Sequence, residues 1–315
     1  MRTVSILHDN IRIFNTLAIE TSAVCNRSCV FCPVHGSDRP DEKMDWGMIE
    51  KIAEELEFLR WQGRISLYIY NEPMRDQRIY EIISYLRGVL PSVCLMISTN
   101  GDYLKSSSQI QDLRAAGVNQ LLINVYSATD GNPDPKRVAH GVELAERRHK
   151  TFLDWFTDLG IDKSKGSVYT YLKPPGFVCK IEPKYGVRAE DKNLAGYELQ
   201  NRSGNIDWFQ AALKEPMERG CVRPFRLLNI NWRGDGILCC NDYHGVTDFG
   251  NIREKSLVDI WNHPEFHRYR LFLQNKNRYI PLCDKCDYRG GIYPHMIEKV
   301  TFGDEKDALM LAGGL

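Results

Sequence analysis

The first part of the chain alternates short apolar segments with longer stretches whose apolar residues recur at helical spacing. Alternation or a short apolar run predicts a strand, and a period near 3.6 residues predicts an amphipathic helix. The predicted strands are residues 17–20, 64–70, 93–98 and 120–126. The predicted helices are residues 46–61, 78–86, 109–116 and 138–156. Repeated strand-then-helix units predict a parallel sheet, open or closed into a barrel.

Polar residues stand where three of the predicted strands end. Ligand sites of parallel α/β folds lie at the carboxyl ends of the strands, so we expect these side chains to face one site. They are Tyr70, Asn71, Glu72, Ser98, Thr99, Asn100, Asn124 and Tyr126. Ordinary turn chemistry is the alternative for each of them, since a pair such as Asn100-Gly101 is also a common turn signal.

The pattern weakens after residue 131, and residues 173–204 are rich in Pro, Gly and charge, which predicts long loops. A second unit is expected to begin near Glu218. The length of 315 residues suffices for one large and one small domain. The 41 basic and 41 acidic residues balance, which gives no reason to expect nucleic acid or a membrane as a partner.

The N-terminal residues lack the apolar stretch of a signal peptide. No apolar run approaches the roughly 20 residues that span a bilayer. We therefore expect a cytoplasmic protein. In that reducing compartment, ten cysteines indicate metal binding or catalysis rather than disulfides. Seven fall into two groups, and Cys94, Cys179 and Cys240 are left over.

The first group is Cys25, Cys29 and Cys32, with the spacing CxxxCxxC. Thiolates are soft ligands that suit iron–sulfur clusters or zinc. Three cysteines can bind three irons of a [4Fe–4S] cube and leave the fourth iron open for another ligand. Zinc is the alternative and needs a fourth ligand, which His35 could supply. The spacing favours the cluster.

The second group is Cys221, Cys239, Cys283 and Cys286. The surrounding pattern predicts a β-hairpin that carries one ligand, then a helix, then a CxxC knuckle. Four cysteines can hold either zinc or a fully liganded [4Fe–4S] cluster. Spacing alone does not separate these two possibilities.

At these residues the chain resembles the radical S-adenosylmethionine (SAM) superfamily. Residues 70–73, Tyr-Asn-Glu-Pro, are similar to the family motif whose backbone holds the SAM amine, with Asn71 in place of the usual glycine. Residues 98–101, Ser-Thr-Asn-Gly, resemble the motif that faces the SAM ribose and carboxylate. The resemblance implies a partial (β/α)6 TIM-type barrel and SAM on a [4Fe–4S] cluster held by the first cysteine group. It also implies SAM contacts by the eight strand-end residues, with Asn124 and Tyr126 facing SAM from the fourth strand. A reductase such as flavodoxin or ferredoxin is the implied partner.

The second cysteine group resembles the auxiliary-cluster extension called SPASM, in its single-cluster form, twitch. The shared pattern is Gly234-x4-Cys239, a Gly-Asn-Ile at residues 250–252 and the final CxxC. It implies that the four cysteines of the second group bind another [4Fe–4S] cluster and that Cys240 is spare. The implied organisation is a barrel over residues 1–215, an auxiliary-cluster domain over residues 216–300 and a tail over residues 301–315.

The chain is also similar to radical SAM dehydrogenases that oxidise an alcohol of an aminocyclitol, as in butirosin biosynthesis. Shared segments include residues 63–66, 99–104 and 201–204. In such a dehydrogenase the arginine of the matching Asn-Arg segment contacts the substrate, which makes Arg202 the candidate here. A solvated loop arginine is the alternative.

The resemblance implies hydrogen abstraction by a 5′-deoxyadenosyl radical. The implied product is a ketone from a secondary alcohol of a sugar or aminocyclitol in antibiotic-like metabolism, with the auxiliary cluster accepting the electron. His244 and Tyr243 are candidate bases, with turn packing as the alternative role. Epimerisation, with Cys179 or Cys240 donating a hydrogen atom, is the rival reaction. Modification of a ribosomal peptide and a zinc-binding interaction protein are the remaining alternatives.

Overall fold

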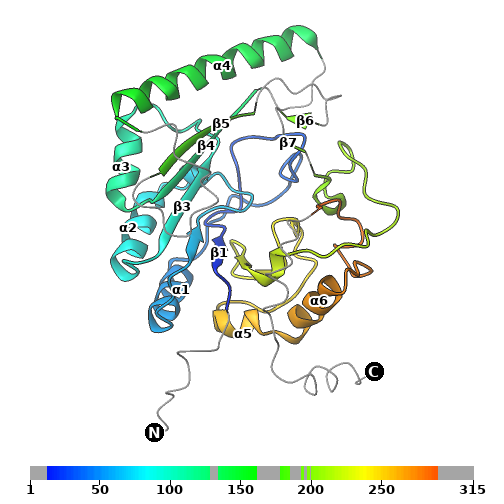
Figure 1. Ribbon diagram of the computed structural model, residues 1–315. Helices are drawn as coiled ribbons and strands as arrows, with labels where there is room; N and C mark the ends of the chain where they lie inside the picture. The colour runs from blue at the N-terminus through cyan, green and yellow to red at the C-terminus, as the bar shows by residue number, and fades with distance from the viewer. Residues whose placement is uncertain are drawn as a thin grey trace.

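The computed structural model describes residues 13–127, 134–161, 178–184, 193–194, 197–198 and 200–289. Its centre is a seven-stranded sheet with the strand order β5-β4-β3-β2-β1-β8-β9, partly wrapped into a barrel (Figure 1). The strands are β1 (Thr16–Ile19), β2 (Arg64–Ser66), β3 (Cys94–Thr99), β4 (Gln120–Tyr126), β5 (Val178–Lys184), β8 (Leu227–Ile230) and β9 (Gly236–Ile237). A separate antiparallel pair is formed by β6 (Asn193–Leu194) and β7 (Tyr197–Glu198).

Six strands of the main sheet run parallel. β1 to β5 pair with their neighbours in chain order, and β8 adds to the free side of β1 in register from Thr16↔Leu227 to Ile19↔Ile230. β9 turns back on β8 as an antiparallel hairpin. The predicted partial (β/α) barrel is confirmed. The predicted hairpin is present, and it extends the main sheet rather than standing apart from it.

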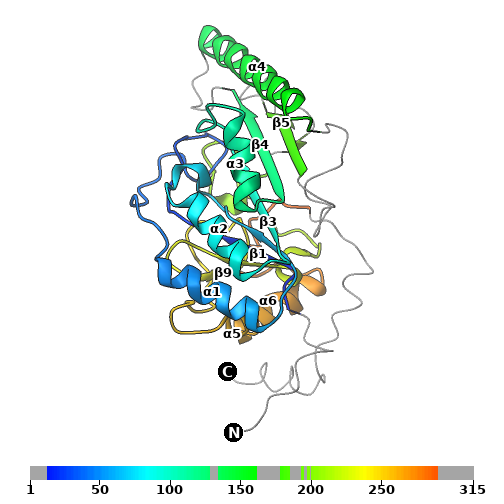
Figure 2. The same cartoon turned by 90° about the vertical axis from the view of Figure 1, so that its left-hand side faces the viewer.

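Helices cover the outer face of the sheet (Figure 2). They are α1 (Trp46–Phe58), α2 (Ile79–Val89), α3 (Ser108–Ala116) and α4 (Pro135–Asp158). α2 buries Ile79, Ile82, Ile83 and Leu86, whose spacing forms one apolar stripe. Each such side chain stabilises the fold by about 1.5–3 kcal/mol through removal of its apolar surface from water. The sheet contributes alternate residues to this core, so its remaining residues face the barrel interior.

Residues 178–184 correct the prediction of long loops over residues 173–204. They form β5, which pairs with the whole of β4, from Gln120↔Val178 to Tyr126↔Lys184. A strand of this length was hidden by the Pro- and Gly-rich sequence around it, and its backbone partners are supplied only by β4. Residues 173–177 and 185–192 lie outside the described residues.

The C-terminal unit adds α5 (Leu257–Trp261) and α6 (Pro264–Gln274) around two buried arginines. The guanidinium of Arg270 lies 3.9 Å from the ring centroid of Trp261 and donates to the carbonyl oxygen of Pro224. Arg278 donates to four backbone carbonyl oxygens, including that of Cys286. Hydrogen bonds of this kind offset the cost of burying a charge, and they fix the loop that carries the final CxxC.

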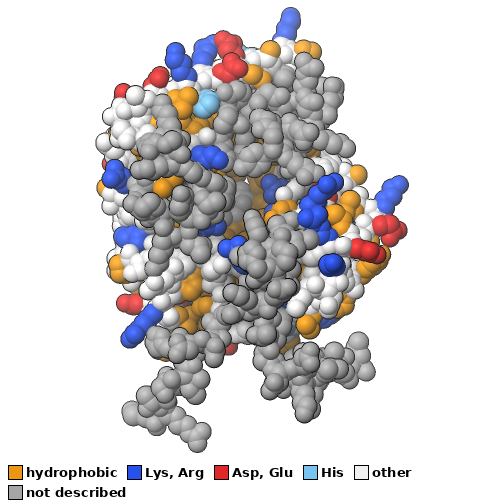
Figure 3. All heavy atoms as spheres, viewed as in Figure 1, with side chains coloured by type: hydrophobic (Ala, Val, Ile, Leu, Met, Phe, Trp, Pro, Cys, Tyr) orange, Lys and Arg blue, Asp and Glu red, His pale blue; other side chains and the backbone are white. Residues whose placement is uncertain are grey.

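The boundary expected near residue 215 stays a prediction, and residues 301–315 lie outside the described residues. Within the part that the structure describes, no helix has the length and apolar character required to cross a membrane. On the face shown in Figure 3, basic side chains lie in the middle as well as at the margins, and acidic side chains lie mainly toward the margins.

Candidate active site

The loop with the first three cysteines leaves the carboxyl end of β1. Two short turns shape it, in which the Cys32 N–H donates to the Cys29 carbonyl and the His35 N–H donates to the Cys32 carbonyl, each at 2.9 Å. The backbone N–H of Arg27 points at the Cys25 sulfur, 3.4 Å away. Donors aimed at sulfur suit thiolates that bind a cluster.

Zinc at the first cysteine group would need His35 as a fourth ligand. The His35 Nδ1 lies 3.0 Å from the Ser28 carbonyl oxygen, and the His35 ring packs against Trp208. Among the described residues, no three His, Cys, Asp or Glu side chains are arranged around a position for a single metal ion. Tetrahedral zinc needs four ligand atoms within about 2.3 Å of one centre, whereas an iron–sulfur cube spreads its thiolates more widely.

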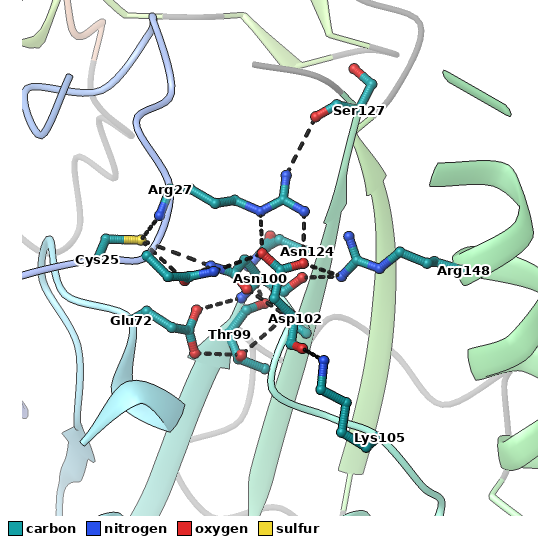
Figure 4. A network of polar contacts seen from close by, with 12 residues as sticks. Cys25, Arg27, Glu72, Thr99, Asn100, Asp102, Lys105, Asn124, Ser127 and Arg148 are labelled. Carbon is teal, nitrogen blue, oxygen red and sulfur yellow. Dashed lines mark hydrogen bonds and ion pairs between the residues drawn. The ribbon is translucent and has the colours of Figure 1, made fainter. Parts of the chain in front are cut away.

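The carboxylate of Glu72 joins the ends of two strands (Figure 4). One oxygen accepts from the Thr99 hydroxyl at 2.6 Å and from the Met74 N–H at 3.1 Å, and the other accepts from the Asn100 N–H at 2.7 Å. Burial raises the pKa of Glu72 to about 7. The side chain is therefore engaged within the protein, and the contact of Glu72 with SAM stays a prediction.

Asn71 is engaged in the same way. Its amide nitrogen donates to the Thr21 hydroxyl at 3.1 Å, and its oxygen accepts from the Ile69 N–H at 3.1 Å. An asparagine here thus fixes the turn after β2 through its side chain, which the glycine usual in the family motif has no atoms to do. The contact of Asn71 with SAM stays a prediction.

A polar network connects the first cysteine loop to the end of β3 and to α4 (Figure 4). The Asn100 amide donates to the Asn26 side chain at 2.8 Å and points at the Cys25 sulfur at 3.8 Å. Arg27 donates two hydrogen bonds of 2.6 and 2.7 Å to the Asp102 carboxylate, and Arg148 forms an ion pair with the same carboxylate at 2.8 Å. Burial acts to raise the pKa of Asp102, but the guanidinium of Arg27 lowers it below its usual value. Arg27, Asp102 and Arg148 were not predicted, since residues so far apart in sequence carry no local signal for an ion pair.

The end of β4 faces the first cysteine loop from inside the barrel. Asn124 donates to the Ser98 hydroxyl at 2.9 Å, so two predicted residues meet. The Tyr126 ring lies 5.6 Å from that of Phe31, within the loop. Burial raises the pKa of Tyr126, and the neighbouring Cys29 and Cys32 raise it further. Contact of Ser98, Asn124 and Tyr126 with SAM stays a prediction.

A fully buried carboxylate, Glu20, stands at the end of β1. It accepts from Arg39 at 2.9 Å and from the Tyr70 N–H at 3.2 Å, and burial raises its pKa to about 7. The Arg39 guanidinium lies 3.8 Å from the ring centroid of Tyr243. Sequence reasoning missed Glu20 and Arg39, although Glu20 closes a predicted strand and the rule applied to the other strand ends would have found it.

Tyr70 connects the barrel to the loop of the second cysteine group. Its hydroxyl donates to the carbonyl oxygen of Cys240, and its ring packs edge-on against Tyr243 at 4.7 Å. The hydroxyl of Tyr243 is hydrogen-bonded to Ser37. His244 is exposed and lies against the Tyr243 ring.

Two cavities adjoin this region and share a wall that includes Ser37 and Arg39. One has a volume of about 450 Å³ and is lined by aromatic and polar side chains, among them Trp208, Trp232 and His244. The other has a volume of about 290 Å³ and lies beside the first cysteine loop. Both are large enough for small-molecule ligands or parts of them.

The structure brings the second cysteine group together. Four predicted ligands line one small pocket: Cys221, Cys239, Cys283 and Cys286. The Asn241 N–H lies 3.4 Å from the Cys239 sulfur, and the Asn241 amide nitrogen lies 3.5 Å from the Cys286 sulfur. Arg223 also lines this pocket. Such donors and charges tune the potential of an iron–sulfur cluster. Cys240, predicted to be spare, is not among the residues that line the pocket.

Arg202 is half-buried and belongs to a tight turn between the two cysteine groups. Its positive charge opposes the rise that burial causes in the pKa of the Cys32 thiol and of the Tyr70 and Tyr126 phenols, so the guanidinium lies near these three side chains. This placement argues against a solvated loop arginine. Contact with the substrate stays a prediction.

The prediction that Cys179 lies in a loop near the site is wrong. Cys179 is in β5, 5% exposed, and packs in the core between the sheet and the helices. Its neighbour Val178 instead faces inward with Leu122. Alternation along β5 therefore points the thiol away from the site. Cys94, expected in the core, is buried as well.

Comparison with protein families identifies the class of the enzyme. The model of the radical SAM superfamily matches residues 19–177, half of the chain. The chain belongs to the radical SAM superfamily. A second model, described as the iron-sulfur cluster-binding domain SPASM, matches residues 221–287. This radical SAM enzyme therefore uses SAM and two [4Fe–4S] clusters, as predicted, and the cysteine loops described above fit that requirement.

Individual relatives of this radical SAM enzyme are more distant. The S-adenosyl-L-methionine-dependent 2-deoxy-scyllo-inosamine dehydrogenase of Niallia circulans is 25% identical over 278 residues, 88% of this chain and 94% of its own. The tungsten-containing aldehyde ferredoxin oxidoreductase cofactor-modifying protein of Pyrococcus furiosus is 23% identical and covers 87% of each chain. The crystal structure of BtrN in complex with AdoMet and 2-DOIA has a TM-score of 0.64, with 22% identity, 87% of this chain and 93% of its own. That likeness shows a shared fold.

Proposed function

We propose that this radical SAM enzyme oxidises a secondary alcohol of a sugar or aminocyclitol to a ketone. The observation that carries the proposal is the position of the half-buried Arg202 in a turn between the two cluster-binding loops. Asn205 ties this turn to the second cysteine segment, and Trp208 ties the chain after it to the first cysteine loop. An alcohol held there would have the first cysteine loop on one side and the second cysteine group, whose cluster would accept the electron, on the other. The similarity to the dehydrogenase of N. circulans over nearly the whole of both chains supports the choice of reaction.

The bound cofactors supply the abstraction of a hydrogen atom from an unactivated carbon and an acceptor for the electron that remains. The protein's own residues supply position and proton transfer. Arg202 binds the hydroxyl oxygen, orients the adjacent C–H bond and stabilises negative charge as the hydroxyl proton leaves. An arginine suits this task because it stays positively charged throughout.

The proton needs an acceptor near the substrate. His244 lines the larger cavity, and its exposed imidazole can pass a proton to solvent. Tyr243 is less suited, because its hydroxyl is bonded to Ser37 and burial raises its pKa. In this proposal His244 takes the proton, and a flavodoxin or ferredoxin delivers the electron that starts each turnover.

The test is anaerobic incubation of reconstituted enzyme with SAM, a reductant and a panel that begins with 2-deoxy-scyllo-inosamine. Oxidation gives a product two mass units lighter and one 5′-deoxyadenosine per product, with a carbonyl that hydroxylamine traps. Cys29→Ala is the control that removes a ligand of the first cluster.

Epimerisation gives a different result. Its product has an unchanged mass in ordinary water and gains one deuterium in heavy water. Cys240 would then be the hydrogen donor to test, because Cys179 faces the core and Cys240 adjoins a predicted ligand. Such a product would refute oxidation while leaving the radical SAM class intact.

A further inference from the structure

We infer that the CxxC knuckle of the second cluster also positions Arg202, through a clamp formed by Asn201 and Asp287. The inference rests on the proposed function, in which Arg202 contacts the substrate. In it the auxiliary-cluster domain has two tasks, since the segment that holds the cluster also builds the substrate site. Asn201 and Asp287 are positioning residues that act through Arg202.

The Arg202 turn has a backbone conformation that needs support. Arg202, Ser203 and Gly204 have φ angles of +50°, +59° and +80°, all in the left-handed region. Glycine adopts this region readily, but the Cβ atoms of Arg202 and Ser203 make it unfavourable for them. Strained residues of this kind persist only where surrounding contacts over-determine them, and they gather at functional sites.

Asn201 and Asp287 supply the first set of contacts. Asn201 is fully buried, and its backbone N–H donates to both carboxylate oxygens of Asp287, each at 2.9 Å. Its side-chain oxygen accepts from the N–H groups of Ser203 and Asp287 at 3.0 and 3.2 Å. Its side-chain amide donates to the Lys285 carbonyl at 2.7 Å. Asp287 and Lys285 flank the predicted ligand Cys286, so the knuckle and the turn hold each other.

Asn205 supplies a second tether from the other cysteine segment. Its amide donates to the Arg202 carbonyl at 2.7 Å and to the Asn241 carbonyl at 2.6 Å. Asn241 follows the predicted ligand Cys239 by two positions. The turn is thus tied to segments beside two predicted ligands of the second cluster, Cys286 and Cys239.

The tethers also reach along the chain after the turn. Gln210 donates to Asp287 at 2.7 Å, and the Leu213 N–H donates to the Lys285 carbonyl at 3.2 Å. Between them, the indole N–H of Trp208 donates to the Val30 carbonyl in the first cysteine loop at 2.9 Å. Residues 201–213 therefore form a strap from one cluster-binding loop to the other. Loss of the Asp287 carboxylate would remove its hydrogen bonds to Asn201 and Gln210 and loosen the strap at its Arg202 end.

The experiment compares Asp287→Ala with Asp284→Ala in anaerobically reconstituted holoenzyme. Both aspartates directly follow a ligand of the same knuckle, but Asp284 has no hydrogen bond to the strap among the described residues. For 2-deoxy-scyllo-inosamine as the probe, we expect Asp287→Ala to raise KM at least tenfold with a smaller change in kcat. More 5′-deoxyadenosine should form per product. Iron content and absorbance near 400 nm should stay at the parental level, and Asp284→Ala should stay within twofold of the parent in KM.

A double variant tests whether Asp287 acts through Arg202. Arg202→Ala alone raises KM, and adding Asp287→Ala should change it by less than twofold further. Asp287→Asn keeps an acceptor oxygen for the Asn201 N–H and should rescue most of the loss. Effects of Arg202→Ala and Asp287→Ala that multiply would overturn the clamp, and so would a neutral Asp287→Ala. A neutral Arg202→Ala would instead overturn the substrate contact on which both proposals depend.

Hydrogen exchange provides a readout that needs no turnover. Peptides covering residues 200–213 should exchange faster in Asp287→Ala than in the parent or in Asp284→Ala. Should Asp287→Ala lose iron, Asn205→Ala removes the second tether without touching the knuckle and carries the same expectation. Unchanged exchange in an iron-loaded variant would refute the inference whether or not the probe is a substrate.

Discussion

Replacement of Glu72 by glutamine tests the energetic cost of the buried strand-end carboxylate. Glu72 is 3% exposed, and burial raises its pKa from 4.5 to about 7. Each pKa unit corresponds to about 1.4 kcal/mol, so ionisation costs the folded protein roughly 3 kcal/mol relative to the unfolded chain. Glutamine has nearly the same shape and stays neutral, so the variant lacks this cost. Its amide nitrogen cannot accept a hydrogen bond in place of a carboxylate oxygen, but that second cost does not change with pH.

The sign of the pH dependence follows from the raised pKa. A carboxyl group with a higher pKa in the folded state binds more protons there than in the unfolded chain. Its contribution to stability is therefore fully present below about pH 4.5 and is lost as the pH rises through about 7. The free energy of unfolding of the parent should fall over this window relative to that of Glu72→Gln, by roughly 3 kcal/mol.

The assay is urea unfolding of reconstituted holoenzyme under anaerobic conditions at pH 5, 6, 7 and 8. With a slope of about 3 kcal/mol per molar urea, the difference between the midpoints of variant and parent should move by roughly 1 M in favour of the variant. Cysteines released on unfolding and Glu20 also take up or lose protons, but they are the same in variant and parent. Their effect on the free energy of unfolding therefore cancels in the difference between the two proteins. The exposed Glu81→Gln on α2 is the matched control and should follow the parent. Parallel curves for Glu72→Gln and parent would refute the reasoning.

Three further predictions concern other parts of the molecule. A Cβ atom on Gly63 would lie 2.4 Å from a backbone oxygen, so Gly63→Ala should lower the melting temperature sharply. Gly88→Ala, on the open surface of α2, should instead raise stability by about 0.5–1 kcal/mol. Equal melting temperatures for the two variants would contradict the packing described. Cys29→Ala should abolish formation of 5′-deoxyadenosine while keeping about half of the iron, as measured by chromatography and iron assay; continued SAM cleavage would end the radical mechanism. Cys179→Ala and Cys240→Ala should both retain alcohol oxidation by mass spectrometry, and loss of activity with intact iron in either would point to a hydrogen donor.

Much of the site was predictable because its determinants are local. Thiolate spacing indicated the first cysteine group without knowledge of the fold, since a cluster imposes its own geometry on a short loop, and the family resemblance supplied the ligand set of the second group. The rule that chemistry gathers at the carboxyl ends of parallel strands selected Ser98 and Asn124, which the structure brings within hydrogen-bonding distance. Alternating strand and helix patterns likewise predicted the parallel sheet that β1 to β4 form.

Other features depended on contacts between distant segments. The side chains of Glu72 and Asn71 bond to Thr99 and Thr21, which only the packed sheet brings near. Contact of either residue with SAM stays a prediction. Cys179 was placed in a loop because the surrounding composition outweighs one short alternating run. The pairing of β5 with β4 makes it a strand and turns the thiol into the core.

The sequence by itself determined the alternating architecture and two groups of candidate cysteine ligands, because spacing and periodicity act over a few residues, and the family resemblance added the cofactor class. Only the tertiary structure decided that β8 joins β1, that Glu20 meets Arg39, and that the Arg202 turn is fastened to the knuckle at Asp287. These contacts join residues that lie from 19 to more than 200 positions apart in the sequence. Such contacts form only when the whole core packs, and a pattern over a few neighbouring residues does not predict which distant segments will meet.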